Sequence, residues 1–163
     1  MMAGPQLGKT LVALAGEFLV AGQLCMRGCV ASLTLKNYPG VDIFALNPKT
    51  GKQVAIQVKT IKVSPGRRAP ATAYPQGAYF VPESGHEYPD RPFVFVTITS
   101  PDQVDYFIVP GQSVADISER ERQQYLEWAR SAGRTVSEAQ PRMTSLEALS
   151  PFKDRWELLG LED

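Results

Sequence analysis

The sequence predicts a single α/β domain in which helices flank a mixed β-sheet. Three observations support this fold class: an N-terminal segment with helical apolar periodicity, two pairs of short apolar runs that each surround turn formers, and a charged segment with helical periodicity near the C-terminus. The chain of 163 residues is large enough to bury a core, and its 44% apolar and 21% charged residues are ordinary for a soluble globular protein. We find neither an internal repeat nor a long linker, so we expect one domain over residues 1–163.

The first expected element is a helix from about Leu7 to Arg27, which Gly28 ends. Its apolar residues recur at helical spacing and predict one buried stripe, formed by Leu7, Leu11, Leu14, Phe18, Ala21 and Cys25. Glu17 falls at the edge of that stripe, where it either reaches solvent or is aimed into a cleft. Because Glu17 interrupts the apolar stretch and no basic leader precedes it, we expect neither a signal peptide nor a membrane span, and a cytoplasmic protein.

Three strands are expected next, the last two as a hairpin. They are Cys29–Lys36, Val41–Asn47 and Gln53–Ile61. The turn formers of residues 48–51 connect the second strand to the third. If Asn47 pairs with Lys52 across this turn, the residue numbers of every cross-strand pair sum to 99.

The rest of the chain supplies a second hairpin and the C-terminal helices. A proline-rich segment follows Lys62, with a short strand expected only near Ala78–Val81. Phe93–Thr99 and Val104–Val109 predict the second hairpin. Gln112–Ala132 predicts a charged helix, and residues 150–161 predict a short one. The residues that we expect these two helices to bury are Val114, Ile117, Tyr125 and Trp128 in the first, and Phe152, Trp156 and Leu159 in the second.

The cysteines indicate no metal site. Cys25 and Cys29 are the only cysteines, and the single histidine, His86, is far from them in sequence. The chain therefore lacks a zinc-type ligand set. We expect both thiols to be buried and reduced, with a disulfide as the alternative.

The first hairpin is the candidate site, because its register brings three polar residues together. Asp42 would lie opposite Gln57, and Lys59 would be a diagonal neighbour on the same face. Mg²⁺ prefers oxygen ligands and takes one or two carboxylates, so Asp42 and Gln57 could hold it. Lys59 could orient an attacking water and stabilise the charge on a phosphoryl group. The alternative is an ordinary polar strip at a strand edge.

The charge distribution favours a polyanionic partner. Residues 1–82 contain nine basic residues and two acids, Glu17 and Asp42, whereas residues 83–163 contain eight basic residues and fifteen acids. A basic field around an isolated pair of carboxylates suits nucleic acid held at a metal site. The residues expected to bind it are Lys49, Lys52, Lys62, Arg67 and Arg68.

Three short motifs together resemble the PD-(D/E)xK nuclease superfamily, which has the restriction-endonuclease-like fold. They are Gly16-Glu17 on the leading helix, Gly40-Val41-Asp42, and Ile56-Gln57-Val58-Lys59-Thr60. The closest likeness is to branches with glutamine at the second acid position, such as Mrr-like enzymes and short bacterial proteins. The resemblance implies a helix followed by a three-stranded antiparallel meander.

By that resemblance, four residues form the catalytic site. Asp42 is a metal ligand, Gln57 occupies the substituted acid position, Lys59 is the catalytic lysine, and Glu17 is a helix carboxylate that assists the metal or the water. The implied cofactor is Mg²⁺ or Mn²⁺. Because Gln57 carries no charge, the site should bind metal more weakly unless Glu17 compensates.

The expected function is metal-dependent endonucleolytic hydrolysis of DNA phosphodiester bonds. One alternative is a catalytically inactive nuclease-fold module that binds nucleic acid or a partner protein. Another is a structural α/β interaction protein in which Asp42 and Lys59 form an ion pair. DNA is the expected partner and no membrane contact is expected, while a homodimer and a separate recognition partner both remain open.

Overall fold

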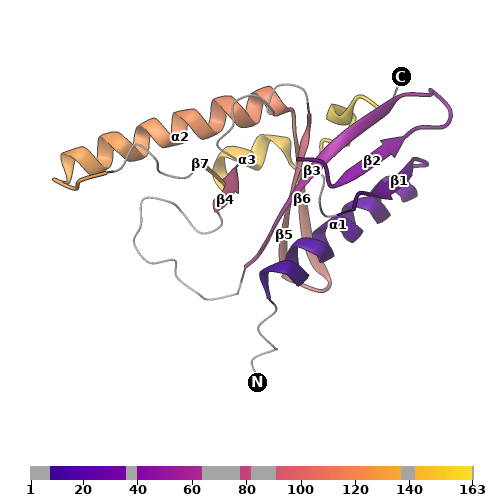
Figure 1. Ribbon diagram of the computed structural model, residues 1–163, viewed down its shortest axis with the longest axis horizontal. Helices are drawn as coiled ribbons and strands as arrows, with labels where there is room; N and C mark the ends of the chain where they lie inside the picture. The colour runs from indigo at the N-terminus through magenta and orange to yellow at the C-terminus, as the bar shows by residue number, and fades with distance from the viewer. Residues whose placement is uncertain (1–7, 36–39, 64–77, 82–90, 137–141, 163) are drawn as a thin grey trace.

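The computed structural model describes residues 8–35, 40–63, 78–81, 91–136 and 142–162 (Figure 1). These residues form a single α/β domain, as predicted. Its elements, in chain order, are α1 (Lys9–Met26), β1 (Val30–Leu33), β2 (Ile43–Leu46), β3 (Gln53–Lys62), β4 (Ala78–Val81), β5 (Phe93–Ser100), β6 (Gln103–Val109), α2 (Gly111–Ser131), β7 (Arg142–Ser145), α3 (Leu146–Leu149) and the 3₁₀ helices η1 (Ser150–Phe152) and η2 (Trp156–Leu159).

The main sheet is mixed, with five strands in the order β1-β2-β3-β5-β6. The β1–β2, β2–β3 and β5–β6 pairs are antiparallel, and only β3 and β5 are parallel. The chain therefore begins with a helix and a three-stranded antiparallel meander, and the second hairpin joins the sheet through its first strand. The short strands β4 and β7 pair separately as an antiparallel ribbon.

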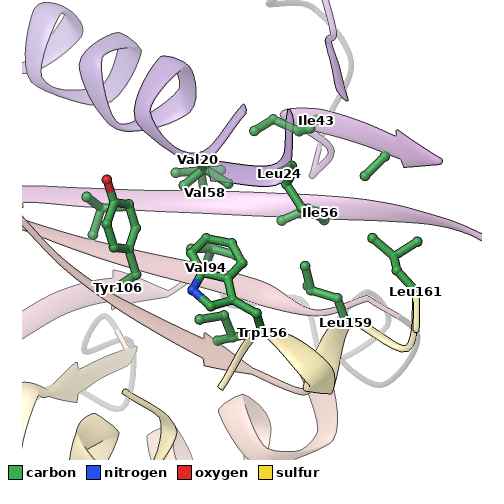
Figure 2. Close-up of a cluster of buried hydrophobic side chains, with 13 residues drawn as sticks. Val20, Leu24, Ile43, Ile56, Val58, Val94, Tyr106, Trp156, Leu159 and Leu161 are labelled. Carbon is green, nitrogen blue, oxygen red and sulfur yellow. The ribbon is translucent and has the colours of Figure 1, made fainter. Parts of the chain in front are cut away.

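Side-chain alternation along the strands divides the core between the two faces of the sheet. On one face, Val94 and Ile108 pack with α1 and the C-terminal segment, which supplies Trp156 (Figure 2). On the other face, Phe95 and Phe107 pack against α2 and α3. The two long helices thus cover opposite faces.

The buried stripe predicted for α1 is wrong for Leu11, Phe18 and Cys25, which are exposed, whereas Ala21 is partly buried against the core and Leu7 lies outside the described residues. The residues that face the sheet are Gly16, Val20 and Leu24, whereas Leu11 and Phe18 are 56% and 58% exposed. A Cβ atom on Gly16 would lie only 1.8 Å from Thr60 Oγ1, so the helix approaches β3 where it has no side chain. By length and composition α1 could also cross a bilayer, a property that it shares with core helices of soluble proteins.

The cysteines also differ from their prediction. Both are free thiols, but Cys25 is exposed because it lies on the outer side of α1. Cys29 is half-buried, and its burial, together with the nearby charge of Glu162, raises the pKa of its thiol.

The C-terminal part of the chain departs from the prediction in two places. In α2, Val114 and Ile117 are buried as expected, but Leu126 and Ala129 replace Tyr125 and Trp128 at the interface. The helix expected over residues 150–161 is instead η1 and η2, with α3 before them. The break between η1 and η2 contains Asp154, whose φ of 56° is incompatible with a continuous right-handed helix. Trp156 and Leu159 are nevertheless buried as predicted, and Phe152 is partly buried.

Candidate functional site

The predicted register of the β2–β3 hairpin is confirmed. The pairs run from Ile43 opposite Ile56 to Leu46 opposite Gln53, so the residue numbers sum to 99. Asn47 N donates to Lys52 O at 2.9 Å, which closes the turn as expected. β2 is shorter than predicted at both ends, since it runs from Ile43 to Leu46 and leaves Asp42 outside the strand, whereas β3 extends one residue further than predicted, to Lys62.

Asp42 lies where β3 changes its pairing partner. Up to Ile56, β3 pairs with β2, and from Gln57 onward it pairs in parallel with β5. The N–H of Val58 is then left without a strand on the β2 side, and it donates to Asp42 Oδ2 at 2.7 Å. The carboxylate thus occupies the place that β2 would take if it began a few residues earlier.

The backbone around Asp42 is held by neighbouring segments. Asp42 N donates to Ile56 O, and Thr34 N donates to Asp42 O, each at 2.9 Å. Thr34 Oγ1 donates to Val41 O at 2.5 Å. Gly40 adopts a φ of 75°, a conformation that favours glycine, and so explains the glycine of the Gly40-Val41-Asp42 motif. The carboxylate is therefore fixed in position before any ligand binds.

Lys59 is a half-buried cation beside this carboxylate. It pairs with Phe95 of β5 and lies on the sheet face that carries the Phe95 cluster. Burial lowers the pKa of Lys59 below its ordinary value, and the charge of Asp42 acts in the opposite direction. The two predicted residues therefore interact electrostatically, as the hairpin register required.

Gln57 and Glu17 are the other two residues of the predicted catalytic site. Gln57 is half-buried and directly precedes Val58, whose N–H binds Asp42. Glu17 is half-buried on α1 and follows Gly16, which lies against Thr60 of β3. Because α1 covers the face of the sheet opposite to Gln57 and Lys59, the structure places Glu17 at the same end of β3 but on the other side of the sheet. In the part of the chain that the structure describes, no group of three or more histidine, cysteine, aspartate or glutamate side chains could hold a metal ion.

The predicted nucleic-acid-binding residues are not gathered at Asp42. Lys49 and Lys52 are exposed at the hairpin turn, and Lys52 Nζ donates to Glu162 O at 2.6 Å. Lys52 is five residues before Gln57, which corresponds to about 17 Å of extended strand. Lys62 is exposed at the other end of β3. Arg67 and Arg68 lie outside the described residues.

Arg91 is a residue of this region that the sequence did not single out. Its Nη1 donates to Gly40 O at 3.1 Å, two residues before Asp42. The neighbouring Pro92 O accepts a hydrogen bond from Gln57 N at 3.2 Å, so the start of β5 brings Arg91 to the site. Only the parallel pairing of β3 with β5 creates this contact, and no motif in the sequence indicates it.

Comparison with models of known protein families gives no match for this chain, and no curated protein matches it. The functional interpretation therefore depends on the geometry of Asp42, Lys59 and their neighbours.

Proposed function

We propose that the protein is a metal-dependent nuclease that hydrolyses DNA phosphodiester bonds at Asp42 and Lys59. The observation that carries this proposal is the pairing of a carboxylate fixed by Val58 N–H with a half-buried lysine of lowered pKa. A pair of charged groups in this environment is more frequent at functional sites than elsewhere. The leading helix and antiparallel meander also agree with the restriction-endonuclease-like core of the PD-(D/E)xK superfamily.

The donor set fits an open Mg²⁺ or Mn²⁺ site. Mg²⁺ needs only one or two protein carboxylates, because phosphate and water oxygens fill the other positions. Asp42 would supply the carboxylate through Oδ1, since Oδ2 is occupied by Val58 N–H. The amide oxygen of Gln57 would be the further protein ligand. When bound, the ion would polarise the phosphate and lower the pKa of a coordinated water.

The chain itself would orient the substrate and handle the proton. The lowered pKa of Lys59 makes its Nζ a better proton donor and acceptor near neutral pH than an exposed lysine. From Nζ it would position the attacking water and stabilise charge on the phosphate oxygens. Arg91 holds the Gly40 carbonyl, so it would keep the segment before Asp42 in place and add positive charge.

Nucleic-acid binding without cleavage is the second candidate. Two observations favour it: Gln57 contributes no negative charge, and no group of three metal-binding acids is present among the described residues. Both reduce the affinity for a divalent cation. Binding without cleavage would still depend on salt, because lysines would displace counterions from the phosphates.

The proposal is tested by single-turnover cleavage of single-stranded and duplex DNA in Mg²⁺ or Mn²⁺. Asp42→Asn is the informative variant, because an amide oxygen can still accept from Val58 N–H. Asp42→Ala would instead leave that N–H unpaired, at a cost of about 1–3 kcal/mol of folding stability. Lys59→Met retains the apolar stem without the amine. Lys153→Met is the matched control, because Lys153 lies away from the site. Its Nζ forms an ion pair with Asp105 Oδ1 at a distance of 2.6 Å.

We expect Lys59→Met to slow cleavage by about 10²–10⁴-fold, the usual range for a proton-handling group. Asp42→Asn should weaken metal binding and slow the metal-dependent cleavage, and Lys153→Met should cut like the wild type. Wild-type rates in both site variants would overturn the assignment. A wild-type protein that binds DNA with strong salt dependence and never cuts it would establish the second candidate.

A further inference from the structure

Among the described residues, no helix covers the half of one sheet face that lies beside the candidate site. On this face, α2 and α3 cover β5 and β6, burying Phe93 and Phe95. Figure 1 shows α2 running away from β1 and β2. Over those two strands the same face exposes three apolar side chains: Val30, Phe44 and Leu46 are 57%, 51% and 38% exposed.

Phe44 is the central side chain of this uncovered surface. Its cross-strand neighbours are Ser32 on β1 and Ala55 on β3. Both are small, so neither covers the aromatic ring from the side. Leu46 is two residues along the same strand and pairs with Val30, which extends the surface as a flat apolar strip.

The strip continues directly into the candidate site. Asp42 is two residues before Phe44, which is about 7 Å along an extended chain. On the next strand, Gln57 is two residues after Ala55, and Lys59 is two residues after Gln57. Gln57 and Lys59 alternate onto the face of Phe44, and the Asp42 carboxylate lies at the edge of β3, where it accepts from Val58 N–H. A polymer bound at Asp42 and Lys59 would therefore pass over or beside Phe44.

The charges around the strip identify the kind of occupant. Residues 43–63 contain no acid, and two of their lysines adjoin the strip: Lys49 is exposed at the turn that ends it, and Lys59 is half-buried on the same face. Lys52 and Lys62 alternate onto the opposite face, where Lys52 Nζ donates to Glu162 O. The positive charge of Lys49 and Lys59 is complementary to a polyanion. A second copy of the chain seated here would place the same lysines against one another, and like charges across an interface are unfavourable.

We propose that Phe44 is a stacking platform for an unpaired base, so that the substrate class of this site is single-stranded nucleic acid. This proposal rests on the proposed function for its location and deepens it. An aromatic side chain lying on a sheet can stack on a base only when the base is free of its neighbours, as in single strands. In an intact duplex the base faces are covered, and Phe44 would meet the sugar–phosphate backbone.

Binding measured in EDTA separates this inference from catalysis. The probes are a fluorescently labelled oligo(dT) and a labelled duplex hairpin of equal length, titrated at fixed salt and followed by anisotropy. Phe44→Ala removes the ring and Phe44→Tyr keeps it. Phe18→Ala is the matched control, because Phe18 is an equally exposed phenylalanine on α1, which covers the opposite face. Thermal unfolding checks that each variant is folded.

We expect Phe44→Ala to weaken oligo(dT) binding by about 5- to 150-fold, which corresponds to about 1–3 kcal/mol for one stacked base. Phe44→Tyr should bind within about twofold of wild type, and Phe18→Ala should change neither probe. Three results would overturn the proposal. Phe44→Ala could bind oligo(dT) as tightly as the wild type, it could lose as much affinity for the duplex as for oligo(dT), or it could dissociate a dimer that the wild type forms. If oligo(dT) binding depends on Phe44 but the wild type cuts no DNA, the nuclease proposal fails and this inference stands.

Discussion

Replacing Gly16 with alanine tests how α1 is seated on the sheet. The new Cβ would lie 1.8 Å from Thr60 Oγ1 and 2.8 Å from Thr60 Cβ. Neither distance is allowed between non-bonded atoms, so α1 must move away from β3 or Thr60 must shift. Because Thr60 Cβ is fixed to the strand backbone, rotation of the side chain alone does not remove the conflict.

The size of the effect follows from two opposing contributions. Inserting a methyl group into a packed interface costs about 1–3 kcal/mol. Alanine in a helix interior is more favourable than glycine by about 1 kcal/mol. We therefore expect Gly16→Ala to lower the free energy of unfolding by up to about 2 kcal/mol, and Tm by roughly 2–4 °C for each kcal/mol in a chain of this size.

Gly22 provides a control in the same helix. A Cβ atom on Gly22 would meet no atom within 4 Å, so Gly22→Ala should stabilise the protein by about 0.5–1 kcal/mol. Thermal and urea unfolding of both variants measure whether each substitution raises or lowers the free energy of unfolding. Adding Thr60→Ala to Gly16→Ala should restore part of the loss, because it removes Oγ1 but leaves Cβ. If Gly16→Ala and Gly22→Ala stabilise the protein equally, the contact between α1 and β3 is not as described.

Two further predictions concern charged groups. Asp42→Asn should lower the pKa of Lys59 further, because the charge of Asp42 raises this pKa against the effect of burial. NMR titration of the Lys59 side chain without metal measures the shift. An unchanged or raised pKa would contradict the proximity of Asp42 and Lys59. Arg27 lies over the Trp156 ring, with its Cζ 4.3 Å from the ring centroid, so Arg27→Ala should cost about 0.5–1 kcal/mol in urea unfolding, and equal stability would show that the contact contributes nothing.

The β2–β3 hairpin could be predicted from sequence because two independent signals agree. The alternation of apolar residues along β3 fixes which side chains face the core, and the turn formers before Gly51 fix the register. The relation between Asp42 and Lys59 follows from that register. The start of β2 at Ile43 rather than at Val41 was not predictable, because it depends on β3 changing its pairing partner from β2 to β5.

The orientation of α1 could not be predicted because apolar residues occur all around the helix. Leu11 and Phe18 form one helical stripe, and Val20 and Leu24 form another, so periodicity does not select a face. The face that packs on the sheet is instead selected by the close approach of α1 to Thr60. This approach is possible because residue 16 is glycine.

Arg91 was missed for a different reason. It contacts the Gly40 carbonyl only because β5 aligns in parallel with β3 after a long intervening segment. Pairings between distant segments leave little signal in a single sequence. The exposure of Phe44 could not be predicted for the same reason. Strand alternation assigns Phe44 to one face of the sheet, but it does not indicate that α2 covers only the other half of that face.

The most direct test of the central claim is the single-turnover cleavage rate of the Asp42→Asn/Lys59→Met double variant. Residues that act together in one reaction have effects that do not multiply. We expect the double variant to cut DNA about as slowly as the slower single variant. Two separate losses that multiply, or cleavage at the wild-type rate, would contradict the claim that Asp42 and Lys59 form one catalytic site.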